Sequence, residues 1–235
     1  MTKPIHIFRH IAHEGPGYLG LFLNRQNIPF EIIEVDQGAP IPQTPDNSAG
    51  LVFMGGPMSV NDPLPWIEPE LALIRQAVAC KMPVLGHCLG GQLISKALGG
   101  SISSNHTKEI GWLDVERLDN ATARSWLTDL PQRFAAFHWH GETFSIPAGA
   151  SHILKSDHCR HQAFAFDNVL AMQCHIEMTA ELVPLWADCN AQEIAQPSAT
   201  VQSKTTMTQN LEQRVAALQK VADQLYSRWL QGLAR

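Results

Sequence analysis

The sequence lacks the long apolar run that a membrane-spanning helix requires. No stretch of its 235 residues approaches about eighteen consecutive apolar residues. Charged residues make up only 17% of the chain, and the formal net charge is −5. These features argue against a transmembrane protein and give no sign of binding to nucleic acid or to a membrane surface. Because Met1–Pro4 leads directly into a predicted strand, we also expect no secretory leader.

Cysteine is scarce as well. The chain has five cysteines, an odd number, and they are widely scattered in a chain long enough to form a core without disulfides. We therefore expect free thiols and a cytoplasmic protein. The length suits one large domain, and no internal repeat indicates a second.

One stretch in the middle of the chain carries the strongest signal of chemistry. An apolar run ending at Leu85 predicts a buried strand, and it is followed by Gly-x-Cys-x-Gly around Cys88 and by a helix over Leu89–Leu98. Strand, tight turn and helix form the pattern of a nucleophile elbow, here with cysteine in place of serine. The helix N-terminus would favour the thiolate. A buried structural cysteine in an ordinary turn is the alternative that this stretch alone leaves open.

Two other predicted strands favour a reactive cysteine. The strand Leu51–Met54 ends in a Gly-Gly-Pro turn at 55–57, and a later strand over Val169–Glu177 carries His175 and Glu177. Side chains two residues apart lie on the same face of a strand. A general base and the group that orients it need this relation.

The order of elements predicts an α/β fold. Up to Gly100, apolar strands alternate with helices, which is typical of a mostly parallel, doubly wound sheet with its ligand site at the carboxyl ends of the strands. After Gly100, extended segments predict added antiparallel strands that return His175 to the side of Cys88.

The C-terminal part reads as a connector and a helix. Residues 191–208 are polar, and apolar residues recur at helical spacing within 209–232. We expect this helix to pack on its own domain; a homodimer seam is the alternative. The predicted organisation is a single domain over 1–235, with a catalytic core over about 1–190.

Three of these segments resemble the class I (triad) glutamine amidotransferases. Gly55–Pro57, Gly86–Gln92 and His175–Glu177 have the family's order and spacing, and the similarity extends from about Ile5 to Glu177. Phe137–Phe144 is similar to a segment of stand-alone proteins related to the amidotransferase domain of GMP synthase. The resemblance implies a flavodoxin-like sheet. One departure is Ile176, where most members have proline; a strand tolerates isoleucine well.

The resemblance also implies a reaction. Cys88 would attack a side-chain amide carbonyl, His175 would transfer the proton, and Glu177 would orient the imidazole. The backbone N–H groups of Gly56 and Leu89 would stabilise the oxyanion. The reaction would cleave glutamine to glutamate and ammonia through a cysteinyl thioester.

Substrate contacts follow from the same resemblance. Gln92 corresponds to a glutamine-contacting residue, and Trp139, Gly141 and Glu142 fall where the α-amino and α-carboxylate groups are held. Met58 stands where many members have glycine. Met58 and the bulky Trp139 favour a pocket reshaped for a larger γ-glutamyl compound.

Three functions are therefore open. The first is a glutaminase or amidotransferase subunit that supplies ammonia to a separate synthetase. The second is a stand-alone γ-glutamyl peptidase or hydrolase, and the third is a catalytically silent binding module, which the complete Cys–His–Glu set disfavours. We expect no cofactor, and no nucleotide site, because no Gly-Lys-Ser/Thr follows the Gly-Gly-Pro turn.

Other polar clusters carry weaker signals. His138 and His140 alternate along a strand, but no third ligand at sensible spacing follows, so no metal is expected. His158–His161 is interpreted as an exposed polar turn, and Cys174 as a core residue. His10 and Glu14 either line the pocket or are solvated.

Overall fold

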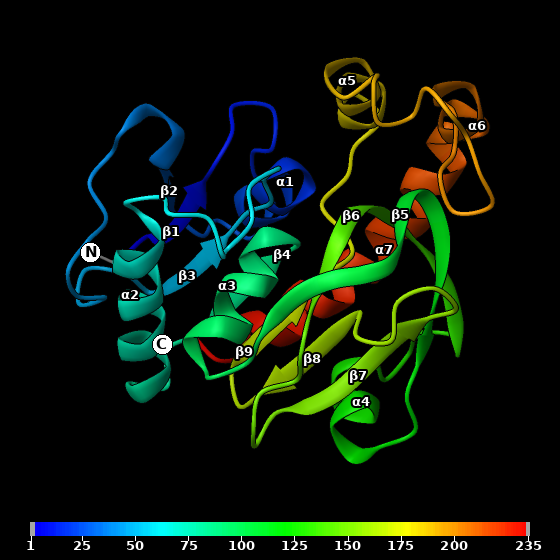
Figure 1. Cartoon of the computed structure of the whole chain (residues 1–235). Coiled ribbons are helices and arrows are strands. Elements are labelled where there is room, and N and C mark those ends of the chain that lie inside the picture. The colour runs from blue at the N-terminus through cyan, green and yellow to red at the C-terminus, as the bar shows by residue number, and fades with distance from the viewer. Residues whose placement is uncertain (1–2, 234–235) are drawn as a thin grey trace.

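The computed structural model describes residues 3–233. Its strands form one nine-stranded sheet, and helices pack against it (Figure 1). In spatial order the strands are β2 (Phe30–Glu34), β1 (Ile5–Arg9), β3 (Gly50–Phe53), β4 (Val84–His87), β9 (Val169–Met172), β8 (Ala163–Phe166), β7 (Ser151–Ser156), β5 (Ile102–Arg117) and β6 (Arg133–Phe144).

The first five strands in this order run parallel. Their order, β2-β1-β3-β4-β9, is that of flavodoxin-like sheets, in which the strand order reverses between β1 and β3 and ligands bind at the carboxyl ends. The other half of the sheet is antiparallel. The predicted fold class, a doubly wound parallel sheet with added antiparallel strands, is confirmed.

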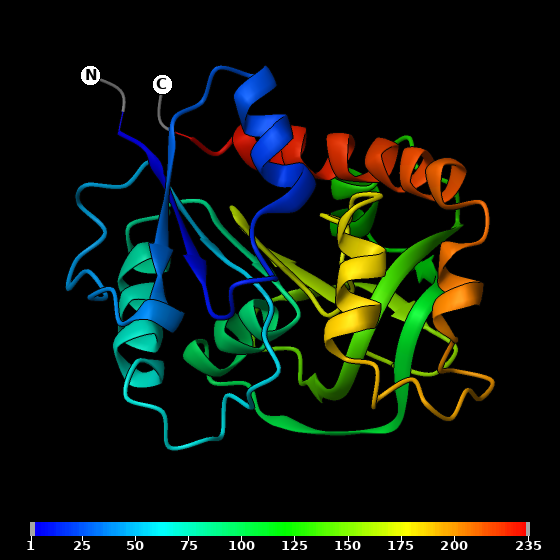
Figure 2. The ribbon, with the colours of Figure 1, turned by 90° about the horizontal axis from the view of Figure 1, so that it is seen from above.

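Helices cover both faces of the parallel half (Figures 1 and 2). One core contains Ile7, Val52 and the buried sides of α1 (Gly17–Arg25) and α7 (Leu211–Leu230). The other contains Phe53 and the buried sides of α2 (Ile67–Ala79) and α3 (Leu89–Ala97). Because side chains alternate along a strand, an apolar strand supplies both cores, which is why these strands read as continuous apolar runs.

Shorter helices connect the rest of the chain. They are η1 (Val35–Gln37), α4 (Ala121–Trp126), α5 (Leu182–Cys189) and α6 (Lys204–Thr208). The segment predicted as a polar connector therefore contains a helix, α6, and also Val201, which bridges to Ile110 of β5.

The predicted strand over Val169–Glu177 is too long. Strand β9 ends at Met172, and His175 instead forms an isolated antiparallel bridge with Phe137 of β6. Pairing with β4 ends at Met172, and the next residue, Gln173, donates its backbone N–H to the carbonyl of Gln162, in the segment before β8. His175 and Glu177 thus follow the strand rather than belonging to it.

The C-terminal helix α7 packs on its own domain. It lies beside α1 in Figure 2. Asp223 of α7 accepts hydrogen bonds from the Tyr18 hydroxyl at 2.8 Å and from Arg25 at 2.7 Å. The buried side of α7 comprises Val215, Leu218, Val221, Ala222, Leu225, Tyr226 and Trp229. Asn210 before the helix has a left-handed backbone conformation, so the helix begins at Leu211.

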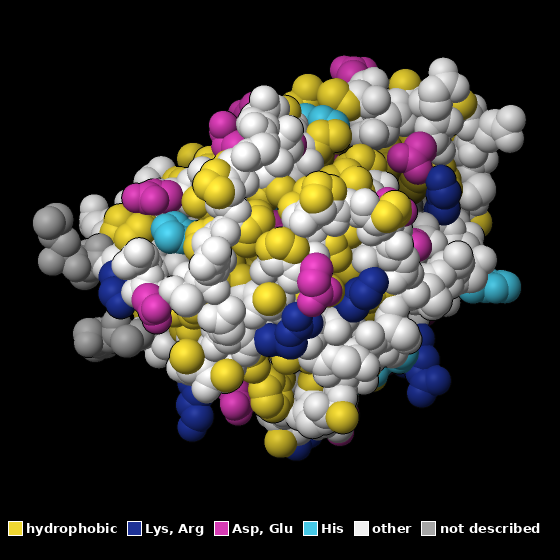
Figure 3. Space-filling model, turned by 60° about the vertical axis from the view of Figure 1, so that its left-hand side comes forward, with side chains coloured by type: hydrophobic (Ala, Val, Ile, Leu, Met, Phe, Trp, Pro, Cys, Tyr) yellow, Lys and Arg dark blue, Asp and Glu magenta, His cyan; other side chains and the backbone are white. Residues whose placement is uncertain are grey.

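Charges are dispersed on the face shown in Figure 3, where Lys and Arg side chains alternate with Asp and Glu without forming one continuous patch. Among the helices within residues 3–233, none has the length and apolar character needed to cross a membrane.

The packing of α7 leads to a stability prediction. Leu218→Ala should lower the free energy of unfolding by about 2–5 kcal/mol, because Leu218 is 1% exposed and its loss leaves a cavity. Chemical denaturation measures the change. The same substitution at Leu21 of α1, which is 54% exposed, should change stability by less than about 0.5 kcal/mol. Equal effects at the two positions would contradict the packing of α7.

Candidate active site

The turn around Cys88 has the geometry of a nucleophile elbow. Cys88 has φ +50° and ψ −108°, a backbone conformation that is rare for a residue with a side chain, and it directly precedes helix α3. Its N–H donates to the carbonyl of Met172 at the end of β9, at 2.8 Å. A Cβ at Gly90 would overlap the Phe53 carbonyl, and one at Gly91 would overlap that of Met172. Glycine is needed because the helix starts in contact with two strand ends.

His175 and Glu177 are paired beside this turn. His175 Nδ1 lies 2.6 Å from Glu177 Oε1, and both side chains are buried. Two backbone hydrogen bonds tie His175 to Phe137 of β6, and the ring packs edge-on against Trp186 at 4.8 Å between centroids. The imidazole is therefore fixed by strand, carboxylate and indole together.

The electrostatics of the pair favour opposite charges. Burial works against a charged His175, but the Glu177 carboxylate and the Cys88 thiol outweigh it and raise the pKa of His175 well above its usual value. Burial likewise opposes ionisation of Glu177, but His87 and His175 outweigh it and lower the pKa of Glu177 to about 2. The pair is suited to hold a proton on the imidazole.

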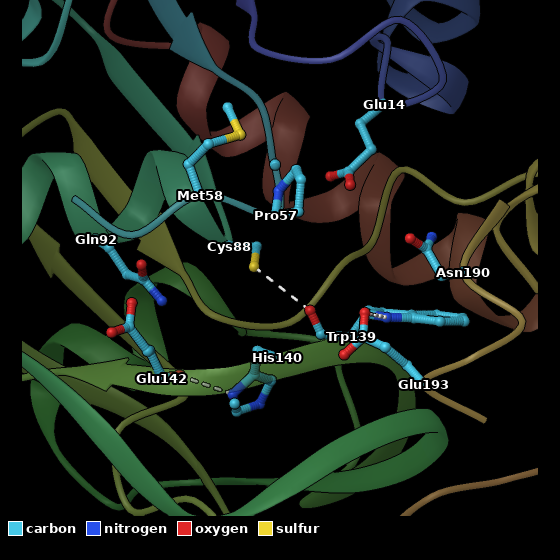
Figure 4. A pocket seen from close by; sticks show the side chains of 12 residues that line it. Glu14, Pro57, Met58, Cys88, Gln92, Trp139, His140, Glu142, Asn190 and Glu193 are labelled. Carbon is cyan, nitrogen blue, oxygen red and sulfur yellow. Dashed lines mark hydrogen bonds between the residues drawn. The ribbon is translucent and has the colours of Figure 1, made fainter. Parts of the chain in front are cut away.

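The Cys88 sulfur lies among polar groups. Its Sγ is 3.7 Å from the carbonyl oxygen of Trp139 (Figure 4). It also accepts a hydrogen bond from Gln173 Nε2 at 3.4 Å. Gln173 Oε1 in turn accepts from Gln92 Nε2 at 3.2 Å. Gln173, which sequence reasoning missed, thus connects the predicted nucleophile with a predicted substrate contact. Its place two residues before His175 was the only available signal.

Cys88 opens into a pocket of about 120 Å³ (Figure 4). A single water needs about 10–15 Å³ of such space, so the pocket has room for a small molecule. All the predicted substrate contacts line it, namely Met58, Gln92, Trp139, Gly141 and Glu142.

Two of these side chains are held in place. Glu142 accepts a hydrogen bond from Ser59 at 3.1 Å, and Trp139 Nε1 donates to Glu193 at 3.1 Å.

The two predicted oxyanion donors are neighbours. Gly56 follows β3 and lines the pocket, and Leu89 is the first residue of α3. A Cβ built at Gly56 would lie 3.0 Å from Leu89 Cδ2. The Leu89 N–H has no acceptor within its own helix, as for every residue in a first helical turn.

Four polar side chains line the pocket besides Cys88 and the predicted contacts: Glu14, His140, Asn190 and Glu193. The sequence left open whether His10 and Glu14 line the pocket or are solvated. Glu14 lines the pocket, whereas His10 is buried between Met54 and Glu70. Asn190 and Glu193 carried no sequence signal, because a polar segment with no motif gives no indication of which of its residues folds over a site.

The interpretation of His158–His161 as an exposed turn is wrong at Cys159. Cys159 is 1% exposed, and burial raises the pKa of its thiol to about 11. Cys174 is buried as expected, and burial raises its pKa too.

Cys159 belongs to a buried cluster with Glu109 and His140, whose ligand atoms lie within 4.8 Å of one another. These atoms are already paired: His140 Nε2 is 2.9 Å from Glu109 Oε2, and Ser156 donates to Glu109 Oε1 at 2.7 Å. His138, at the side of the cluster, has a pKa lowered to about 3 by burial. The contacts are those of a closed hydrogen-bond network.

Comparisons with known proteins agree with this arrangement. The sequence model described as "Glutamine amidotransferase class-I" matches residues 22–182. The glutamine amidotransferase-like protein YfeJ of Salmonella typhimurium is 28% identical over 197 residues, which are 81% of this chain and 82% of that protein. GMP synthase [glutamine-hydrolyzing] of Thermomicrobium roseum is 31% identical over 55% of this chain, which spans only 23% of that enzyme.

A solved structure is similar over the whole chain. The crystal structure of a glutamine amido transferase from Methylobacillus flagellatus superposes with a TM-score of 0.96 at 42% identity, covering 100% of this chain and 97% of that one. Since the family model covers well over half of the sequence, this chain belongs to the class I glutamine amidotransferase family.

Proposed function

We propose that this protein hydrolyses the side-chain amide of glutamine, or of a related γ-glutamyl amide, through a thioester on Cys88. The observation that carries this proposal is the strained turn at Cys88 at the mouth of a pocket, beside a buried His175–Glu177 pair at 2.6 Å. Nucleophile, base and orienting carboxylate are the three parts that nucleophilic acyl transfer requires.

The first half of the reaction forms the thioester. His175 first takes the thiol proton of Cys88, and the resulting thiolate Sγ attacks the amide carbonyl carbon. The C–N bond then breaks, and His175 delivers that proton to the leaving nitrogen, which departs as ammonia or an amine. The raised pKa of His175 supports this role, because the ring keeps the proton until the leaving nitrogen accepts it.

The second half releases the acid. A water replaces the amine, loses a proton to His175 and attacks the thioester carbon. The C–S bond breaks, the sulfur regains a proton from His175, and the γ-carboxylate of glutamate is released. In both halves the N–H groups of Gly56 and Leu89 would stabilise the oxyanion, and losing one such donor typically costs about 10²–10³ in rate.

The destination of the ammonia gives two versions of this function. The GMP synthases similar to this chain are named glutamine-hydrolyzing, which supports an amidotransferase unit that supplies ammonia to a synthetase. The wall formed by Trp139 and Glu193 supports the other version, a hydrolase acting on larger γ-glutamyl compounds, because it adds an aromatic and a charged group beside the nucleophile.

The role of Cys88 is tested by substitution. Cys88→Ala should reduce glutamate release by at least about 10³-fold and abolish labelling by an electrophilic glutamine analogue, because no other group forms the thioester. Cys80→Ala, at an exposed cysteine, should keep full activity and labelling. Full turnover by Cys88→Ala would rule out the thioester. Specific labelling of the wild type without turnover would indicate that a partner is required.

The role of Glu177 is tested through the pH profile. Glu177→Gln removes the charge that raises the pKa of His175, so the ring should lose its proton at lower pH. We expect kcat/KM to fall by about 10²–10⁴-fold, with its alkaline limb shifted to lower pH. The matched control is Glu212→Gln, at an exposed position of α7. An unchanged alkaline limb would contradict the proposed pairing.

A further inference from the structure

Glu14 presents a buried carboxylate to the pocket without a hydrogen-bond partner. The residue is 9% exposed and lines the pocket with Cys88; in Figure 4 its side chain points into the cavity. Within residues 3–233 no group donates a hydrogen bond to the carboxylate, and its nearest ion-pair nitrogen, His13 Nε2, is 4.0 Å away. Burying an unpaired carboxylate is unfavourable, so this position is suited to a cation that arrives with a ligand.

Glu14 lies on the His175 side of the nucleophile. A Cβ at Gly55 would overlap Glu14 Oε2 and would lie 3.1 Å from His175 Cε1, so the carboxylate and the imidazole flank the same small space. Glycine at position 55 leaves that space free. Gln92 and Glu142 lie across Cys88 from Glu14 in Figure 4.

This placement assigns the two sides of the pocket. His175 delivers its proton to the leaving nitrogen, so that nitrogen must lie toward the imidazole and hence toward Glu14. The γ-glutamyl part of the substrate then occupies the opposite side, with Gln92 and Glu142.

Three of the side chains that line the pocket are acidic. Glu14, Glu142 and Glu193 contribute carboxyl groups, and Glu193 is already paired with Lys108 Nζ at 2.9 Å. A leaving group that carries a carboxylate would be repelled by the Glu14 carboxylate on this side. One that carries an ammonium group could form a charge-assisted hydrogen bond with Glu14.

We propose that Glu14 forms a subsite for a cationic leaving group, so that the preferred substrates are γ-glutamyl amides of aminoalkyl amines rather than γ-glutamyl amino acids. This inference rests on the proposed γ-glutamyl hydrolysis and specifies its substrate class. The family model begins at residue 22, so Glu14 lies outside the segment that defines the family match.

Glu14 titrates near neutral pH. Burial raises its pKa to about 7, with opposing effects from His175 and His10 and supporting effects from Glu177 and Glu193. The neighbouring His13 has a pKa lowered by burial, which favours its neutral form. Glu14 is therefore increasingly charged as the pH rises through neutrality, and selectivity for a cation should increase with it.

Three amides of matched length test the proposal. They are the γ-glutamyl amides of 1,2-diaminoethane (cationic), propylamine (neutral) and glycine (anionic), with glutamate release as the readout. We expect kcat/KM for the cationic amide to exceed that for the anionic one by at least about 10²-fold. Glu14→Gln should reduce this ratio at least about tenfold, Glu14→Asp should restore part of it, and Glu212→Gln should leave it unchanged.

The pH dependence separates a charge effect from a structural one. Between pH 6 and 8 the ratio of cationic to neutral amide should rise in the wild type and stay flat in Glu14→Gln. A flat ratio in the wild type, or the same rise in Glu14→Gln, would overturn the proposal even if total activity changes.

Binding to an inactive variant keeps this test independent of turnover. Calorimetry with Cys88→Ala should rank the amides in the same order, and Cys88→Ala/Glu14→Gln should lose that order. If the wild type cleaves none of the amides and no glutamine, the proposed hydrolysis fails, but the binding order still decides the role of Glu14. Equal binding of all three amides would eliminate the subsite while leaving the hydrolysis intact.

Discussion

The site depends on the close approach of helix α3 to the ends of strands β3 and β9. Gly90 lies against the Phe53 carbonyl and Gly91 against that of Met172, with no room for a side chain at either position. The helix start is therefore locked to two strands, and the hydrogen bond from Cys88 N–H to Met172 holds the turn. These contacts make the strained backbone of Cys88 tolerable, because a strained residue persists only where its surroundings over-determine it.

A chain of buried polar groups extends from this turn to the C-terminal helix. His87 Nε2 lies 3.6 Å from Glu177 Oε2 and 3.1 Å from the hydroxyl of Tyr226 on α7. Burial lowers the pKa of His87, which favours a neutral ring next to the carboxylate. Within the described residues Glu177 Oε2 has no hydrogen-bond partner, since His87 Nε2 lies beyond hydrogen-bond distance. Helix α7 thereby contacts His87, the residue before Cys88, although the helix lies beyond the segment matched by the family model.

The pocket combines segments that are far apart in the chain. Glu14 comes from the loop after β1, Met58 from the loop after β3, Trp139 from β6 and Glu193 from the segment after α5. Their meeting point is the carboxyl edge of the parallel sheet, where the strand order reverses and loops diverge. The same edge brings the carboxyl groups of Glu14, Glu142 and Glu193 to the pocket of Cys88, and Glu193 is paired with Lys108 at 2.9 Å.

The sequence by itself determined the α/β class and the elbow. Apolar strands such as Leu51–Met54 and a Gly-x-Cys-x-Gly turn are local patterns with a local physical cause. The sequence also predicted the pairing of His175 with Glu177, although the strand predicted to carry them was too long. Their alignment comes instead from a bridge between His175 and Phe137, two segments that no local pattern connects.

Tertiary structure alone decided which polar residues surround the sulfur. Glu14 and His10 were equivalent by sequence, yet one lines the pocket and the other is buried against Glu70. Cys159 belongs to a polar stretch of the sequence but is buried, because it contacts residues of β5, β6 and β7. Burial, charge and pKa depend on neighbours brought together by the whole fold, and periodicity along the chain carries no information about those neighbours.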